Sequence, residues 1–309
     1  MTNPIDALLA EKGVLLADGA TGTNLFAMGL EAGEAPELWN EAHPDRVAAL
    51  HQGFVDAGAD IILTNSFGGT RHRLKLHHAQ DRVRELNRKA AEIARAVADK
   101  AGRRVIVAGS VGPTGELLQP LGSLTYEQAV DAFAEQIEGL KEGGAEVAWI
   151  ETMSAPGEIR AAAEAAIRVG LPYTYTGSFD TAGRTMMGLA PKDIHGVADG
   201  LGDAPAAVGA NCGVGASDTL AALLDMSGAR PEATIIVKGN CGIPEFRGTE
   251  IHYSGTPELM ADYARLAIDG GARIVGGCCG TSFAHLKAMR DALDAHRKAQ
   301  RPAQSGMPA

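Results

Sequence analysis

One short stretch, Ala206-Ala207-Val208-Gly209-Ala210-Asn211, is apolar up to its last residue, and the longer amphipathic segment 217–226 follows it. Seven other stretches have the same form, each short, rich in apolar and β-branched residues, and followed by a longer segment: Gly13–Asp18, Asp60–Asn65, Arg104–Ser110, Glu146–Glu151, Pro172–Ser178, Thr234–Gly239 and Arg273–Gly276. Continuous apolar runs of this length predict strands buried on both faces, as in a parallel sheet. The segments between most of them predict helices.

Eight such units in a chain of 309 residues match a (β/α)8 barrel, which typically has about 250 residues plus insertions. The alternative is a doubly wound open sheet, whose first strand–helix turn usually carries Gly-x-Gly-x-x-Gly. The first turn here, Asp18-Gly19-Ala20-Thr21-Gly22-Thr23, lacks that spacing. We therefore predict an α/β fold with one (β/α)8 barrel domain over residues 1–297 and a disordered tail over residues 298–309.

The composition excludes several classes of protein. The net charge is −10, and the one basic cluster, residues 71–75, is short enough to be an exposed helix face, so we expect no nucleic-acid partner. The chain begins without a signal-peptide pattern, and no apolar run approaches the roughly 18 residues that span a membrane. We expect a cytoplasmic protein, in which the four cysteines are metal ligands or reactive thiols and not disulfides.

The cysteines all follow the last three predicted strands, at Cys212, Cys241, Cys278 and Cys279. In a barrel the active site is built at the carboxyl ends of the strands, so thiols from these strands can converge on one ion. Three cysteines with an open fourth position describe a catalytic zinc site, and soft thiolates favour zinc over magnesium or calcium. The alternatives are cysteines packed as small apolar side chains, or a disulfide between the adjacent Cys278 and Cys279.

Two carboxylates, Asp18 and Glu151, end apolar runs. A charge at the buried end of a strand needs a partner. That partner is either the ammonium group of a substrate or a cation of the protein itself in a salt bridge or helix cap.

At this point the sequence resembles the homocysteine S-methyltransferase family. The resemblance rests on these motifs: Asp18-Gly19-Ala20-Thr21-Gly22-Thr23, Glu37-Leu38-Trp39-Asn40, Thr64-Asn65-Ser66-Phe67, Trp149-Ile150-Glu151-Thr152, Gly209-Ala210-Asn211-Cys212-Gly213, Lys238-Gly239-Asn240 and Gly276-Gly277-Cys278-Cys279-Gly280-Thr281. It covers nearly the whole chain, and the nearest likeness is to the bacterial betaine–homocysteine methyltransferases.

The resemblance implies a reaction and a site. Zn²⁺ would bind Cys212, Cys278 and Cys279, and homocysteine would be methylated on its sulfur to give methionine. The homocysteine ammonium would lie near Asp18 and Glu151, and its carboxylate against backbone N–H groups around Gly19, Ala20 and Thr64. The resemblance also selects Cys212 over Cys241, because the family usually has a small residue at the second position.

The methyl donor is less determined. Glycine betaine is the donor that the resemblance favours, and its quaternary ammonium group would need an aromatic cage. Trp39 matches an aromatic residue that animal betaine enzymes use for the donor, and Phe26, Phe67 and Tyr126 are further candidates. However, those enzymes carry a tyrosine directly after the strand-four glutamate, where this chain has Thr152.

Three alternatives remain open at this stage. The methyl group could come from a corrinoid on a separate protein or from S-methylmethionine. The barrel could instead be a zinc-binding or redox-sensing protein without catalysis. Relatives are often homo-oligomers, a state that the resemblance suggests and the residues do not define.

Overall fold

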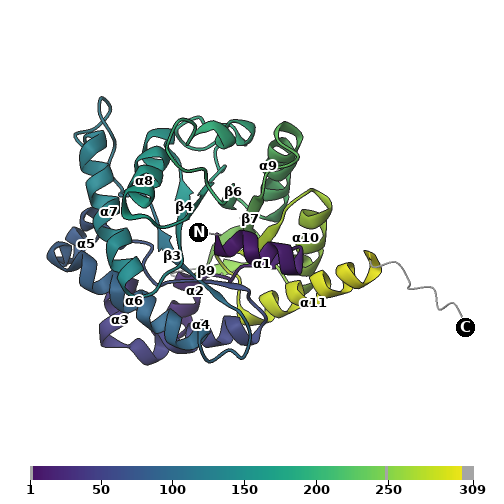
Figure 1. The fold of residues 1–309 in the computed structure, drawn as a ribbon. Coiled ribbons are helices and arrows are strands. Elements are labelled where there is room, and N and C mark those ends of the chain that lie inside the picture. Colours follow the sequence, from purple (N-terminus) through teal and green to yellow (C-terminus); the bar gives the residue numbers. More distant parts are fainter. Residues whose placement is uncertain (1–2, 248–249, 301–309) are drawn as a thin grey trace, which may run out of the picture.

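The computed structural model describes residues 3–247 and 250–300 (Figure 1). Its main sheet has eight parallel strands in the order β1-β10-β7-β6-β5-β4-β3-β2, namely β1 Leu15–Leu16, β2 Ile61–Leu63, β3 Ile106–Val111, β4 Val147–Met153, β5 Tyr173–Gly177, β6 Ala207–Cys212, β7 Ile235–Gly239 and β10 Ile274–Gly277. A parallel bridge between Ala17 and Ile61 joins the two edges of the sheet. The predicted (β/α)8 barrel is confirmed, and every predicted strand lies within one or two residues of an observed one.

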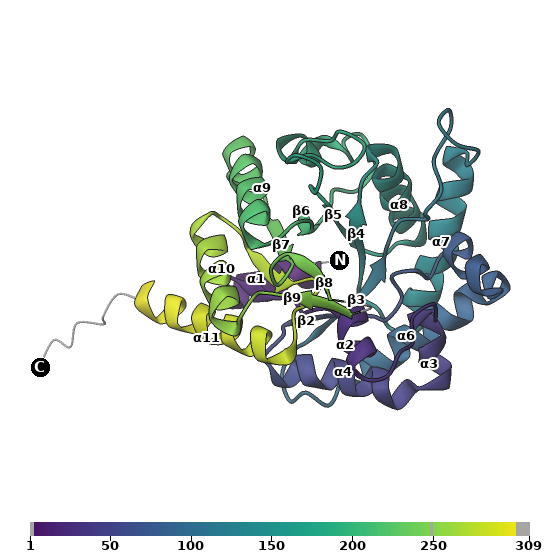
Figure 2. The same ribbon diagram turned by 180° about the vertical axis from the view of Figure 1, so that it is seen from behind.

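Helices surround the sheet on its outside (Figures 1 and 2). The long ones are α4 Pro44–Asp56, α6 Val83–Ala98, α7 Tyr126–Glu142, α8 Pro156–Val169, α9 Ala216–Ala229, α10 Pro257–Asp269 and α11 Phe283–Gln300. Shorter pieces are α2 Thr21–Ala27, η1 Pro36–Leu38, α3 Trp39–Ala42, α5 Arg71–Leu74, η2 Lys75–His77 and η3 Gln80–Arg82. Between β5 and β6 a 3₁₀ segment, η4 Pro191–Gly196, stands where the other units have an α-helix.

Local sequence explains where these elements begin and how closely they pack. The Thr125 side chain caps α7 by accepting from the backbone N–H of Gln128, and the Gln128 side chain accepts from the Thr125 N–H in return. This capping box satisfies two donors that would otherwise be unpaired.

On β6, a Cβ atom at Gly209 would overlap the backbone of Ile236 on β7. The strand that leads to Cys212 therefore needs glycine at this position.

The first helix, α1 Pro4–Lys12, was not among the predicted elements. Figure 1 shows it lying across one end of the barrel, and its buried side chains Ile5, Leu8 and Leu9 pack with apolar strand residues such as Ile61. The helix closes the amino-terminal end of the barrel with apolar surface.

A second unpredicted element lies at the opposite end of the barrel. It is a two-stranded antiparallel hairpin of β8 Pro244–Arg247 and β9 Glu250–Tyr253, which Figure 2 shows in front of the barrel strands. Its last residue, Tyr253, packs against Gly280, where a Cβ atom would overlap the tyrosine side chain. The hairpin thus covers part of the end at which the cysteines lie.

The helix α11 continues to Gln300, and residues 301–309 of the predicted tail lie outside the described part of the chain. The domain boundary at 297 and the disordered tail stay predictions. Among the described helices, none is both long and apolar enough to cross a membrane.

Candidate metal and substrate site

Three cysteines meet at the carboxyl end of the barrel. The Sγ atoms of Cys212, Cys278 and Cys279 all lie within 4.8 Å of one another. Cys212 ends β6, and the adjacent pair follows β10, which β7 separates from β6 in the sheet. Zinc holds cysteine sulfurs at about 2.3 Å in a tetrahedral arrangement, so sulfurs on one ion lie roughly 4 Å apart. The donor set and its spacing therefore fit a zinc ion with one position left open.

Hydrogen bonds hold the backbone of these cysteines in place. Cys279 donates its N–H to the Asn240 side chain at 3.0 Å, and its carbonyl accepts from the N–H of Cys241 at 2.9 Å. The amide of Asn211 lies 3.8 Å from the Sγ of Cys278. A donor at that position stabilises a thiolate, and such outer contacts orient metal ligands.

Cys212 itself has a left-handed backbone conformation, with φ of 61°. A non-glycine residue pays roughly 1 kcal/mol or more to adopt this conformation, and such residues concentrate at functional sites. The strain is compensated by Asn211, whose Oδ1 accepts from the Thr152 N–H at 2.7 Å and from the Thr176 hydroxyl at 2.5 Å.

The thiols are poor nucleophiles as they stand. Contact with Cys212 and burial raise the pKa of the Cys278 thiol above its ordinary value. For Cys212, contact with Cys278 lowers the pKa, but Cys279 and burial outweigh it and bring the pKa to about 11. A bound cation would convert such thiols to thiolates outright.

A buried charged group lies beside the cysteines. The ammonium of Lys238 on β7 contacts Asp18 Oδ1 at 2.7 Å, and the two side chains are 2% and 1% exposed. Asp18 also accepts from the Leu63 N–H at 2.7 Å. Glu151, at the end of β4, accepts from the Ser110 hydroxyl at 2.5 Å. Burial raises the pKa of Glu151, although the Lys238 ammonium and Ser110 oppose the shift.

These groups open onto one cavity of about 580 Å³. Its lining includes the three cysteines together with Ser110, Glu151, Thr152 and Lys238. Apolar and aromatic side chains also line it, among them Phe26, Phe67, Leu76 and Tyr253, as do the charged or titratable side chains Glu34, Glu37, Arg73 and His77. The cavity therefore combines thiols and charged groups with apolar surface.

Most of the predicted site residues converge here. Gly19, Ala20, Thr64, Glu151, Cys212, Cys278 and Cys279 all line the cavity. Asp18 does not line it, but binds Lys238, which does.

Trp39 lies elsewhere. Its side chain is 3% exposed within the hydrophobic core, with an edge-to-face contact to His43 and the Arg46 guanidinium 5.1 Å from its ring. In this structure Trp39 packs in the core and does not line the cavity, and its contact with the donor stays a prediction. Tyr126 is also outside the cavity, because its hydroxyl donates to Glu164 at 2.7 Å between α7 and α8.

Two of the expected backbone donors are already used within the barrel. The N–H of Ala20 donates to the Thr281 carbonyl at 3.2 Å, and that of Thr64 donates to the Ala108 carbonyl at 2.9 Å. A substrate carboxylate therefore finds fewer free N–H groups here than the sequence suggested.

Several cavity residues were missed as site residues, among them Arg73, Lys238 and Tyr253. Lys238 could have been identified from the sequence, since a lysine within Ile235-Ile236-Val237-Lys238-Gly239 places a charge in a strand that is buried on both faces. Nothing in the sequence indicated that Tyr253 is a site residue, because its position depends on the hairpin β8–β9.

Comparison with known proteins gives one consistent result. The sequence profile described as homocysteine S-methyltransferase matches residues 15–293. Methionine synthase of Mycobacterium tuberculosis is 31% identical over 296 residues, which are 91% of this chain and 24% of that protein. Methionine synthase of Mycobacterium leprae is 29% identical over 298 residues, with the same coverage. The chain thus spans about a quarter of the length of these curated relatives.

Comparison with solved structures also finds a homocysteine methyltransferase. The metallated form of the homocysteine methyltransferase MmuM from Escherichia coli superposes with a TM-score of 0.77 at 27% identity, covering 94% of this chain and 99% of that one. The oxidized form of the same protein superposes with the same TM-score at 26% identity.

Proposed function

Because this chain belongs to the homocysteine S-methyltransferase family, we propose that it methylates the sulfur of homocysteine to give methionine, with Zn²⁺ held by Cys212, Cys278 and Cys279. The observation that carries this proposal is the position of the three thiols. They meet within 4.8 Å of one another on the wall of a cavity that also presents Glu151 and Lys238.

The chemistry needs a thiolate at neutral pH. A free thiol has a pKa near 8.5 and is mostly protonated there. Zn²⁺ held by the three cysteines would supply that activation, because a coordinating thiol is deprotonated at neutral pH. The chain's own residues hold the rest of the substrate: Glu151 accepts the ammonium group, and the wall around Gly19, Ala20 and Thr64 bounds its carbon chain.

For the donor we favour glycine betaine. The cavity wall carries the aromatic rings of Phe26, Phe67 and Tyr253, which attract a quaternary ammonium group, and the cationic Arg73, which attracts a carboxylate. In the transfer, the sulfur forms a bond to one methyl carbon as the carbon–nitrogen bond breaks. The electron pair stays on nitrogen, so dimethylglycine leaves without needing a proton at the departing atom.

A second donor has one observation in its favour. The chain is similar to about a quarter of two methionine synthases, so a methyl-corrinoid carried by a separate protein could enter the same cavity. S-methylmethionine, which is a small molecule, is a third candidate methyl donor. The three donors share the proposed thiolate half of the reaction.

The test is a donor comparison with purified, zinc-loaded protein and homocysteine. We expect methionine and dimethylglycine in equal amounts from betaine. Methionine formed only from a methylated corrinoid or from S-methylmethionine would contradict the betaine donor and keep the homocysteine half.

A pair of cysteine variants tests the metal centre. Cys212→Ala removes one of three expected ligands, and we expect loss of bound zinc and of methionine formation. Cys241→Ala is the matched control, because Cys241 is fully buried and its Sγ lies 3.2 Å from the Gly255 carbonyl, outside the three-cysteine cluster. Full turnover in Cys212→Ala, or equal zinc loss in both variants, would contradict the assignment.

A further inference from the structure

The proposed function uses the ring of Tyr253 and leaves its hydroxyl without a role. Tyr253 is the last residue of β9, and it lines the cavity together with the three cysteines. The hairpin that carries it lies in front of the barrel strands (Figure 2). Tyr253 therefore reaches the cysteines from an element outside the eight-stranded sheet.

The backbone ties the end of this hairpin to the cysteines. Gly255 donates its N–H to the carbonyl of Cys241 at 3.0 Å, and Cys241 donates its own N–H to the carbonyl of Cys279 at 2.9 Å. On the other side, the Gly255 carbonyl lies 3.1 Å from Nε2 of His285 on α11. The chain just after Tyr253 is thus held at a defined distance from Cys279.

The ring of Tyr253 packs on the residue that follows Cys279. This residue is Gly280, which has a φ of 80° and no room for a Cβ atom, since that atom would overlap the tyrosine side chain. Glycine adopts such a φ without strain. The backbone at Gly280 therefore lets the ring lie directly against the adjacent pair of cysteines.

The hydroxyl of Tyr253 is hydrogen-bonded to the side chain of Cys279. Contact with Cys212 lowers the pKa of the Cys279 thiol and Tyr253 acts in the same direction, whereas Cys278 and burial raise that pKa above its ordinary value. A phenol keeps its proton at neutral pH, and a metal-bound thiolate has none to give. With a metal bound, the tyrosine is therefore the donor of this hydrogen bond.

Each of the other two sulfurs also has a donor from the protein. The side-chain amide of Asn211 lies 3.8 Å from the Sγ of Cys278, and the side chain of Asn240 is hydrogen-bonded to Cys212. These two donors come from the carboxyl ends of β6 and β7. The third sulfur receives its donor from the hairpin.

We infer that Tyr253 is a positioning residue of the metal site, whose hydroxyl donates to the sulfur of Cys279 and sets the direction of that ligand. The inference rests on the proposed function for the presence of the metal. It goes beyond that function by giving the hairpin β8–β9 a part in holding the metal.

The test measures metal binding and the electronic state of the sulfur, without methyl transfer. Tyr253→Phe removes the hydroxyl and keeps the ring on Gly280. In competition with a chromophoric chelator we expect its zinc affinity to fall roughly 10-fold, as for other partners that orient metal ligands. With Co²⁺ in place of Zn²⁺, we expect the sulfur-to-cobalt charge-transfer band to move to longer wavelength, because a thiolate that has lost a hydrogen bond holds its electrons less tightly.

The matched control is Tyr173→Phe. It removes a tyrosine hydroxyl that donates to the Asp203 carbonyl at 2.7 Å and does not line the cavity. We expect wild-type zinc affinity and an unmoved cobalt band. A hydroxyl that only stabilised the hairpin would weaken zinc binding in Tyr253→Phe and leave the band where it is. An unmoved band in Tyr253→Phe, or an equal shift in Tyr173→Phe, would overturn the inference.

The outcomes separate this inference from the proposed function. If the band shifts and zinc affinity falls in Tyr253→Phe, but the wild type forms no methionine from any of the three donors, the proposed function fails and the role of Tyr253 stands. If the wild type forms methionine and Tyr253→Phe has the zinc affinity and cobalt band of the wild type, the inference fails and the proposed function stands.

Discussion

His51 on α4 is a buried imidazole with an unusual environment. It is 0% exposed, and neither ring nitrogen has a hydrogen-bond partner among the described residues. Burial lowers the pKa of this histidine from 6.5 to about 4. The native protein therefore holds His51 neutral at a pH where the unfolded chain would protonate it.

The sign of the resulting pH dependence follows from proton counting. Between pH 6.5 and about 4, the unfolded state binds a proton at this residue and the native state does not, so stability falls as the pH falls through that window. The loss attributable to His51 approaches about 3 kcal/mol at the lower end. Urea unfolding at several pH values, compared between wild type and His51→Leu, measures it.

The matched control is His78→Asn, which removes an exposed histidine. We expect His51→Leu to flatten the pH dependence between pH 6.5 and 4, and His78→Asn to leave it unchanged. Identical pH profiles for wild type and His51→Leu would contradict the buried neutral state.

The role of an individual site residue could be predicted from sequence where its residue type has few alternative roles in a folded protein. The three cysteines could be predicted because they follow strands whose carboxyl ends meet in a barrel, and Glu151 because a carboxylate is costly to bury without a partner. Trp39 could not be assigned, because an aromatic side chain serves a core and a ligand cage equally well. The pairing of Asp18 with Lys238 joins residues 220 positions apart in the chain, a contact that only the closed barrel creates.

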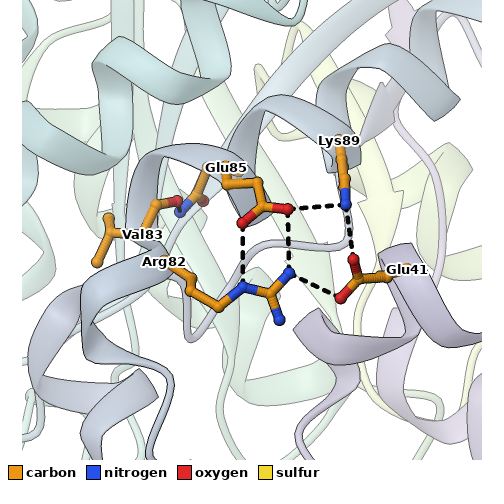
Figure 3. Close-up of polar contacts among 6 residues, drawn as sticks. Glu41, Arg82, Val83, Glu85 and Lys89 are labelled. Atoms are coloured by element: carbon orange, nitrogen blue, oxygen red, sulfur yellow. Dashed lines mark hydrogen bonds and ion pairs between the residues drawn. The ribbon is translucent and has the colours of Figure 1, made fainter.

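Among the elements, the short helix α3 is tied to α6 by charges at the surface. Figure 3 shows Glu41 of α3 bonded to both Arg82 and Lys89, while Glu85 of α6 bonds the same two cations. Hydrogen bonds from Arg82 and Lys89 lower the pKa of Glu85 to about 2. These side chains are exposed to solvent, so salt screens their charges. We therefore expect the ion pairs to affect the local stability of α3 and not the stability of the whole protein.

Glu41→Gln and Glu85→Gln form a matched pair, since both remove a carboxylate from the same two cations. Of the two, only Glu41 belongs to α3. We expect Glu41→Gln to speed amide hydrogen exchange in α3 at low salt, with little difference left at about 1 M salt, where charges are screened over roughly 3 Å. Glu85→Gln should leave amide exchange in α3 unchanged. Equal acceleration of exchange in both variants would contradict the proposed connection of α3 to α6 through Glu41.

The elements also differ in how far sequence could predict them. The eight strands were predictable because each is a continuous buried apolar run. The helix α1 was not, because its apolar residues at Ile5, Leu8 and Leu9 make a short stripe whose partner, the open end of a barrel, exists only after the strands close. The hairpin β8–β9 was missed for a similar reason, since it lies over the barrel end and not in its sheet.

For the whole molecule, Asp60 is one of the residues that connect early and late parts of the chain. Its carboxylate is 2% exposed at the start of β2. It accepts from Lys12 of α1 at 2.6 Å, from the N–H of Leu16 on β1 at 2.9 Å, and from Arg290 of α11 at 3.2 Å. These contacts lie at the amino-terminal end of the barrel, where residues serve stability and not chemistry.

Asp60→Asn keeps the shape of the side chain but leaves three cations, Lys12, Arg103 and Arg290, without their shared partner. Removing one member of a buried charge cluster typically costs about 3 kcal/mol or more, and we expect that loss in urea unfolding. The affinity for methionine should not change, because the cavity is at the other end of the barrel. The control is Asp294→Asn, which removes the other carboxylate on Arg290, at 2.8 Å but 52% exposed, and should cost little. If Asp60→Asn proved as stable as Asp294→Asn, or lost methionine binding, this separation of a stabilising end from a reactive end would be wrong.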